Sequence, residues 1–237
     1  MSNLYFVLIA VICYLIGSFP TAYLLVKKFT GQDIRKIGSG NVGAINVLRA
    51  LKGKSPKLAV FGFLLVLIVD MAKGALSVWT SQKLAFLGYD LTISLILASF
   101  FVVLGHNYSI FLKFRGGRGA ACLMGIMLYL KPISILVWGS PIIICSIIAQ
   151  IILEKMGREE KINWKNFPDI FSILGKQMIG RMIGLALALT PLYFYNPQIF
   201  LPVAGGTILL LIKNIPRLKG YLAGDYNPPT TLPQAGS

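Results

Sequence analysis

The feature that most constrains this chain is its first apolar run, Leu4–Val26, which contains no charged residue across 23 positions. A helix that crosses a bilayer needs roughly 20 such residues. Similar runs recur along the chain, and only 13% of all residues are charged, about half the fraction typical of soluble domains. Because only helices and closed barrels satisfy their backbones in hydrocarbon, the sequence predicts an all-α polytopic membrane protein.

Lysine and arginine fall into four clusters that alternate with the apolar runs. Twenty of the 23 basic residues lie in Lys27–Lys57, Lys113–Arg118, Lys155–Arg181 and Lys213–Lys219. The runs between them are Leu4–Val26, Leu58–Thr80, Leu91–Gly105, Gly119–Leu130, Ile133–Leu153, Met182–Tyr195 and Ile199–Ile212. Threading these runs through a membrane puts all four clusters on one side, which the positive-inside rule makes cytoplasmic. We therefore expect about seven transmembrane helices, with the N-terminus outside and the C-terminus in the cytoplasm.

The chain reads as one integral-membrane domain over residues 1–223, followed by a flexible tail over 224–237 that is rich in Pro and Gly. Residues 154–180 carry mixed charge, with aromatic and aliphatic residues spaced as on one helical face. A cytoplasmic amphipathic helix and a disordered insertion both fit this segment. The cysteines lie inside apolar runs without metal-ligand spacing, so we predict neither a disulfide framework nor a metal site.

A glycine-rich loop with polar residues follows the first apolar run. Gly38, Gly40 and Gly43 let backbone N–H groups converge on an anion, and Asn41 is expected to cap a helix that runs on through Arg49. Such a turn entering a helix suits phosphate, because unsatisfied N–H donors and the helix dipole point at the ligand. A plain tight turn would explain the glycines but not the accompanying polar set, Ser39, Asn41, Asn46 and Arg49.

A second loop alternates three cations with three glycines at the start of another helix: Lys113, Arg115, Gly116, Gly117, Arg118 and Gly119. Arginine grips phosphate with two parallel hydrogen bonds, and glycine lets the backbone approach it. A basic loop on the cytoplasmic face also serves simply to orient a membrane protein. At this point both interpretations stand.

Three ionisable residues lie within or beside the apolar runs. Asp70 and Lys73 are three residues apart, hence on one helix face, where they either neutralise each other or face a polar cavity. His106 is either a hydrogen-bonded structural histidine or a base. No nucleophile–base–acid triad is visible, and Phe111 stands where the acid of an H-x-x-x-x-D pattern would be. The site is therefore expected to work by positioning and electrostatics.

Taken together, these segments resemble the bacterial acyl-phosphate:glycerol-3-phosphate acyltransferase family (PlsY). The resemblance covers most of the chain, in the segments Gly17–Leu24, Gly38–Arg49, Asp70–Gly74, Gly105–Gly119 and Asn214–Leu218. It implies a seven-helix enzyme of the bacterial inner membrane, with its active site on the cytoplasmic face. It also implies transfer of an acyl group from acyl phosphate to the 1-hydroxyl of glycerol 3-phosphate, which gives lysophosphatidate and inorganic phosphate.

The implied chemistry needs neither a cofactor nor a covalent acyl-enzyme, because acyl phosphate is an activated mixed anhydride. A phosphate oxygen, with a second pKa near ~6, can accept the alcohol proton. The implied partners are the two substrates, the lipid bilayer and an enzyme that produces acyl phosphate. We expect a monomer and no nucleic-acid binding.

Carried over by position, the resemblance implies two groups of site residues. The catalytic group is Ser39, Asn41, Arg49 and Asn214. The substrate-binding group is Gly38, Gly40, Gly43, Asn46, Lys73, His106, Lys113, Arg115, Gly116, Gly117, Arg118 and Arg217.

Several positions depart from the family pattern. Ile45 stands where Thr is usual, and Leu211 stands where the family has a histidine. Arg115 and Arg118 stand where the family has two lysines. The positive charge is kept, but a planar guanidinium group with several N–H donors replaces a compact ammonium group. A catalytically divergent paralogue is therefore one alternative. A small membrane transporter of phosphate esters is the other, since charged groups and broken helices near glycine loops also mark transporters.

Overall fold

The computed structural model describes residues 2–224 except 87, 160, 167–169, 171–172 and 174–175, and within these residues every regular element is a helix. The predicted tail after residue 224 and the centre of the 154–180 segment lie outside the described residues. The α-helices are α1 (Ser2–Ser18), α2 (Thr21–Thr30), α3 (Ala44–Lys52), α4 (Pro56–Ala85), α5 (Leu91–Asn107), α6 (Ala120–Leu130), α7 (Ser134–Lys155), α9 (Ile179–Leu187), α10 (Leu189–Tyr195) and α11 (Pro197–Leu222). Two short 3₁₀ turns, η1 (Ile34–Lys36) and η2 (Ile110–Leu112), lie in the loops.

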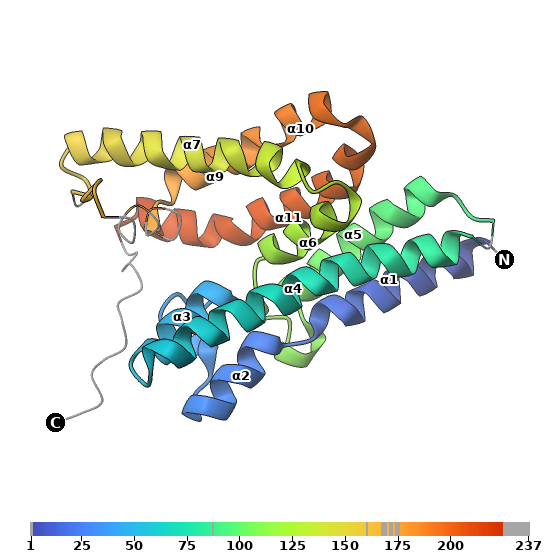
Figure 1. Ribbon diagram of the computed structural model, residues 1–237, viewed down its shortest axis with the longest axis horizontal. Helices are drawn as coiled ribbons and strands as arrows, with labels where there is room; N and C mark the ends of the chain where they lie inside the picture. Colours follow the sequence, from blue (N-terminus) through green and yellow to red (C-terminus); the bar gives the residue numbers. More distant parts are fainter. Residues whose placement is uncertain are drawn as a thin grey trace.

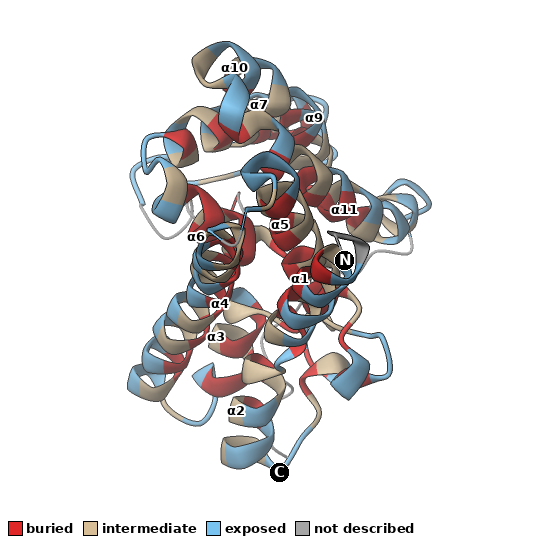
Figure 2. Ribbon diagram, turned by 90° about the vertical axis from the view of Figure 1, so that its right-hand side faces the viewer, coloured by how far each residue is buried: buried red, intermediate tan, exposed pale blue. Residues whose placement is uncertain are grey.

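Within the described residues, five helical segments are long and apolar enough to cross a membrane: Leu4–Thr30, Pro56–Ala85, Leu91–Leu112, Ser134–Lys155 and Pro197–Leu222. Two shorter apolar segments are Ala120–Leu130 and Ile179–Tyr195. Buried residues line the interior between the helices, while exposed residues cover the outside (Figure 2). The predicted all-α polytopic architecture is confirmed.

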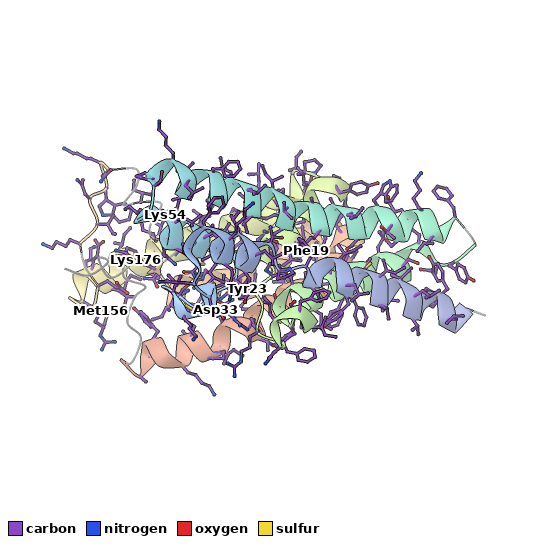
Figure 3. All side chains as sticks on the ribbon, turned by 90° about the horizontal axis from the view of Figure 1, so that it is seen from below. Phe19, Tyr23, Asp33, Lys54, Met156 and Lys176 are labelled. Carbon is purple, nitrogen blue, oxygen red and sulfur yellow. The ribbon has the colours of Figure 1, made fainter. Side chains whose placement is uncertain are left out.

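The first apolar run is broken at Phe19–Pro20, so the expectation of one continuous helix was wrong. Proline has no N–H to donate and disfavours the helical conformation of the residue before it. The Phe19 carbonyl that the break frees accepts hydrogen bonds from Lys73 Nζ at 2.7 Å and from Thr21 N at 3.1 Å. Phe19 lies near the middle of the long axis (Figure 3), so a buried lysine satisfies the backbone where water is scarce.

Glycines allow two helix pairs to pack with their backbones in close approach. A Cβ added at Gly17 would lie 2.1 Å from the Val102 carbonyl oxygen, where α1 meets α5. A Cβ added at Gly125 would lie 1.8 Å from the Met71 carbonyl oxygen, where α6 meets α4. Small residues at such contacts are typical of membrane bundles, in which van der Waals packing holds the helices together.

Figure 1 shows two groups of helices with α5 and α6 between them. One group comprises α1 to α4, and the other comprises α7, α9, α10 and α11. The amphipathic helix α3 and helix α2 lie at the end of the long axis away from the N-terminus, the end at which α7 and α11 also finish (Figure 1). Helix α11 runs to Leu222, ten residues past the predicted end of the last run at Ile212. This extension carries the last basic cluster on the same helix.

Candidate active site

The two glycine loops that the sequence singled out lie against each other. Arg35 Nη1 donates to the Leu112 carbonyl oxygen at 3.0 Å, which ties the first loop to the second. A Cβ added at Gly117 would lie 2.6 Å from the Val42 carbonyl oxygen. The second loop also folds back on the end of α5, because Gly117 N donates to the His106 carbonyl oxygen at 2.9 Å.

The first loop is held in shape by the side chain of Asn46, which is 1% exposed. Its Nδ2 donates to the carbonyl oxygens of Ile34, Ile37 and Asn41 at 2.9–3.2 Å. Its Oδ1 accepts from Ser39 N at 3.2 Å. Both the nitrogen and the oxygen of the Asn46 side-chain amide therefore bond to backbone groups of the first loop. Asn46 thus shapes the loop that presents Ser39.

Asn41 does not cap the following helix, and that expectation was wrong. Helix α3 begins at Ala44, its N-cap is Gly43 in an extended conformation, and no side chain caps it. The N-cap is therefore two residues later in the chain than predicted. Close packing around Gly38 brings Arg49 to this loop, since a Cβ added at Gly38 would lie 3.7 Å from Arg49 Cδ.

Five half-buried cations from four parts of the chain gather beside the loops. Arg49 comes from α3, Arg118 precedes α6, Arg181 lies on α9, and Lys213 and Arg217 lie on α11. Burial, together with the positive charges of Arg181 and Arg49, lowers the pKa of Arg118 to about 10. The charges of Lys213 and Arg217 also interact with that of Arg118.

Two of these guanidinium groups have no protein counter-ion in the described part of the chain. Neither Arg49 nor Arg118 makes a hydrogen bond or an ion pair with another described residue. Burial also lowers the pKa of Arg49. Partly buried cations without a counter-ion are costly, and an anionic ligand offsets that cost. This arrangement is suited to bind phosphate.

Residues of the second loop do not all join this group. Lys113 and Arg115 are exposed, and neither is among the charges that perturb Arg118. On α11, Asn214 is buried, and its Nδ2 donates to the Leu210 carbonyl oxygen at 2.7 Å. The neighbouring Lys213 Nζ donates to the Asn107 carbonyl oxygen at 2.7 Å. The second half of α11 is thereby fixed to the end of α5, next to the second loop.

A second polar group lies at the break between α1 and α2. Lys73 Nζ is 2.6 Å from Asp70 Oδ1, so the two charges neutralise each other as one interpretation predicted. His106 Nδ1 is 3.9 Å from the same oxygen, too far for a hydrogen bond. A small cavity of about 10 Å³ is lined by this group, by residues 17–22 and by Gly117. Among the described residues, no three His, Cys, Asp or Glu side chains gather in a way that could hold a metal ion.

Three residues at the site escaped the sequence reasoning. Arg181 belongs to a basic cluster that was assigned to an amphipathic segment, and Lys213 belongs to one assigned to orientation. Asn107 follows His106, and both polar atoms of its buried side chain lack a hydrogen-bond partner among the described residues. A basic residue flanked by apolar ones, as Arg181 is, was the available signal.

The family model and the similar proteins found by comparison carry the same description. A family model described as "Glycerol-3-phosphate acyltransferase" matches residues 7–156. A Helicobacter pylori protein named glycerol-3-phosphate acyltransferase is 47% identical over 131 residues, which cover 55% of this chain and 58% of the relative. The match therefore spans less than two thirds of that relative. A Clostridioides difficile protein of the same name is 33% identical over 195 residues, which cover 82% of this chain and 90% of the relative.

Two crystal structures share the fold. Both are of PlsY (YgiH), an integral membrane glycerol 3-phosphate acyltransferase, one in its glycerol 3-phosphate form and one in its lysophosphatidic acid form. Each has a TM-score of 0.62 and 21% sequence identity to this chain. The first match covers 95% of this chain and 96% of that protein. On the family model and the Clostridioides relative, the chain belongs to the glycerol-3-phosphate acyltransferase family.

Proposed function

We propose that this protein transfers an acyl group from acyl phosphate to the 1-hydroxyl of glycerol 3-phosphate, giving lysophosphatidate and inorganic phosphate. The observation that carries the proposal is the pair Arg49 and Arg118, partly buried beside two glycine loops without a counter-ion among the described residues. Family membership supports the reaction class. The two similar crystal structures are a glycerol 3-phosphate form and a lysophosphatidic acid form of their protein, and these two compounds are a substrate and a product of the proposed reaction.

The proposed transfer is direct. The acceptor hydroxyl oxygen attacks the carbonyl carbon of acyl phosphate, the bond from that carbon to the phosphate oxygen breaks, and phosphate leaves. The hydroxyl proton passes to a phosphate oxygen, whose second pKa is near ~6. Fixed cations stabilise the negative charge that develops on the leaving phosphate. No step requires an acyl-enzyme or a cofactor.

Within this scheme, Arg49 and Arg118 bind phosphate, and Ser39 on the loop shaped by Asn46 hydrogen-bonds a reacting group. Asn41 and Asn214 are assigned to the catalytic group, and Arg217 adds a phosphate contact. Exposed Lys113 and Arg115 are assigned to attracting anionic substrates. The glycines Gly38, Gly40, Gly43, Gly116 and Gly117 allow the backbone to approach the ligand. Lys73 and His106 support the site from the α1–α2 break.

The proposed setting is the bacterial inner membrane, with one domain over residues 1–223. We take the five long and two short apolar segments as seven crossings, which would put the two termini on opposite sides. The positive-inside rule then favours an outside N-terminus and a cytoplasmic C-terminus. Lys54 and Lys176 lie toward the same end of the molecule (Figure 3), which supports a cytoplasmic end with the site beside it. We propose a monomer that receives acyl phosphate from a separate enzyme.

The reaction is tested by incubating purified protein in lipid or detergent with glycerol 3-phosphate and either acyl phosphate or acyl-CoA. Lysophosphatidate formed with acyl phosphate and not with acyl-CoA is the expected result. Product from acyl-CoA alone would overturn the donor assignment. No product from either donor would favour a divergent paralogue or a transporter, and uptake of labelled glycerol 3-phosphate into proteoliposomes would then separate those two.

A further inference from the structure

Arg35 is a basic residue of the first loop that has its own counter-ion, unlike Arg49 and Arg118. Its Nε donates to Asp33 Oδ1 at 3.0 Å and to Oδ2 at 3.1 Å, and its Nη2 donates to Oδ2 at 2.6 Å. Asp33 Oδ1 also accepts from Arg35 N at 2.9 Å, which caps the 3₁₀ turn η1. A cation paired in this way gains less from binding a phosphate, because its charge is already compensated.

The remaining terminal nitrogen of Arg35 reaches across to the second loop. Its Nη1 donates to the Leu112 carbonyl oxygen at 3.0 Å, the one hydrogen bond between residues 33–43 and 109–119 in the part of the chain that the structure describes. The guanidinium also lies over the ring of Tyr23, 5.5 Å from its centroid. Figure 3 labels Tyr23 and Asp33, which flank it. One planar group therefore holds α2 and both loops together.

The acceptor of this hydrogen bond lies at the start of a strained turn. Leu112 is followed by Lys113 and Phe114, which have φ angles of 53° and 60°. Residues other than glycine rarely adopt this left-handed conformation, and it persists where surrounding contacts hold it. The Leu112 carbonyl oxygen accepts from Arg115 N at 3.2 Å as well as from Arg35. Arg35 therefore supports the turn from which the chain enters the glycines of the second loop.

On its own loop, Arg35 belongs to the same braced unit as Ser39. The Arg35 carbonyl oxygen lies 3.1 Å from a Cβ added at Gly40, so the backbone of η1 packs against the glycine turn. The Asn46 side chain bonds to the carbonyl oxygen of Ile34 and to Ser39 N. A shift of Arg35 relative to the second loop would therefore carry Ser39 with it.

We infer that Arg35 is a positioning residue, which sets the first loop relative to the second and so aligns the two bound substrates; this rests on the proposed function. Ser39 and Arg49 lie on one side of the bridge, and Arg118 lies on the other. A misplacement of about 1 Å can cost about 10²-fold in rate, whereas a partly exposed ion pair such as that of Arg35 contributes little to stability. Loss of the bridge should affect the rate much more than the folding.

The test compares Arg35→Gln and Arg35→Lys with the wild type, with Lys36→Gln as the matched control. Lys36 is the next residue of η1 and is exposed, so its replacement removes the same charge but leaves the bridge intact. Initial rates are measured against acyl phosphate and glycerol 3-phosphate separately, and the thermal unfolding midpoint is recorded for each variant. We expect R35Q to lower kcat about 10- to 100-fold, and K36Q to keep the wild-type kcat.

Both KM values of R35Q should stay within about threefold of wild type, because Arg49 and Arg118 remain able to bind phosphate. Its unfolding midpoint should fall by less than about 3 °C. R35K should recover only part of kcat, since an ammonium group keeps the charge but lacks the planar fork that bonds Asp33 and Leu112 together. Guanidinium chloride at millimolar concentration should raise the kcat of Arg35→Ala in a saturable way, and sodium chloride should not.

Three results would overturn the inference: an unchanged kcat in R35Q, an equal loss of kcat in K36Q, or a raised KM for one substrate with kcat unchanged. The last of these would make Arg35 a ligand of that substrate. Should R35Q fail to fold, the decision rests on R35K below its unfolding midpoint, where a full wild-type kcat would show that charge alone suffices and would overturn the bridging role.

Failure of this inference can be told apart from failure of the proposed function. A wild-type protein that makes no lysophosphatidate refutes the function, and the bridge is then tested without catalysis. Spin labels on Lys36→Cys and Phe111→Cys, at exposed positions of the two loops, report the distance between the loops in a background without the native cysteines. We expect a narrow distribution of distances that broadens in R35Q. Equal distributions with and without Arg35 would refute the inference.

Discussion

At the residue scale, Arg49 and Arg118 are set apart from the many other basic residues by their surroundings. Most lysines near the loops, such as Lys27, Lys52 and Lys57, are exposed and fit a role in orienting the chain. The two arginines are half-buried beside glycine turns, without a counter-ion among the described residues. Their positive charge is therefore available to a bound anion.

Replacing either arginine by glutamine should lower kcat/KM for acyl transfer by about 10²- to 10³-fold, because one preorganised electrostatic contact to the developing charge is lost. Lys52→Gln is the matched control, since Lys52 lies on the same helix as Arg49 and is exposed. Rates are measured on purified variants whose unfolding midpoints equal that of the wild type. Near-normal turnover in R49Q and R118Q would remove both residues from the site.

Asn46 and Asn41 should respond differently to truncation. Asn46→Ala removes a buried amide that bonds four backbone groups of the first loop, and leaving these groups unsatisfied should cost about 2 kcal/mol of stability. Asn41→Ala removes a side chain that makes no hydrogen bond within the described chain, so its stability should stay within about 0.5 kcal/mol of wild type. Denaturation in detergent measures both, and equal stabilities would contradict the bracing role of Asn46.

At the element scale, the close approach of α4 and α6 depends on glycine. Gly125→Ala places a Cβ 1.8 Å from the Met71 carbonyl oxygen, and forcing the helices apart should cost about 1–3 kcal/mol. Gly139→Ala on α7 is the control, since a Cβ there meets nothing within 4 Å, and it should stabilise by about 0.5–1 kcal/mol. Thermal unfolding of both variants decides the point, and an equal effect of the two substitutions would argue against this packing.

The helices follow the apolar runs closely, because the length of an apolar stretch is a local property of the sequence. The ends of the helices and the breaks within them agree less well with the ends of the apolar runs. Pro20 divides the first run, and Met182–Tyr195 splits into α9 and α10. Helix α3 starts at Ala44, after an extended Gly43, because packing by Asn46 overrides the capping preference of Asn41. Such outcomes depend on contacts between segments, which periodicity does not report.

At the scale of the whole molecule, the sequence identified both glycine loops, and the structure places them in contact through Arg35 and Leu112. It could not identify Arg181 or Lys213 as neighbours of Arg118, because these residues reach the site only when α9 and α11 pack beside the loops. Lys113 and Arg115 carried the same local signal as Arg118 but are exposed. Charge and spacing alone do not separate these cases.

The proposed orientation predicts which loops are accessible from each side of the membrane. Phe86 follows the last residue of α4 and is 84% exposed. In a background without the native cysteines, Phe86→Cys should react with an impermeant maleimide added outside. Lys54→Cys, in the first basic loop, should react only after the membrane is opened. Mass spectrometry of labelled cells reads out both. Labelling of Lys54→Cys and not Phe86→Cys from outside would reverse the orientation.

Direct transfer requires that two phosphate-bearing substrates bind together beside Arg49 and Arg118 before the acyl group moves. Steady-state kinetics test this requirement, with the initial rate of lysophosphatidate formation measured over a grid of acyl phosphate and glycerol 3-phosphate concentrations. We predict reciprocal plots that intersect, as required when both substrates must be bound before a product leaves. Parallel lines, together with an acyl group found on the protein when glycerol 3-phosphate is omitted, would show transfer through an acyl-enzyme and rule out direct transfer.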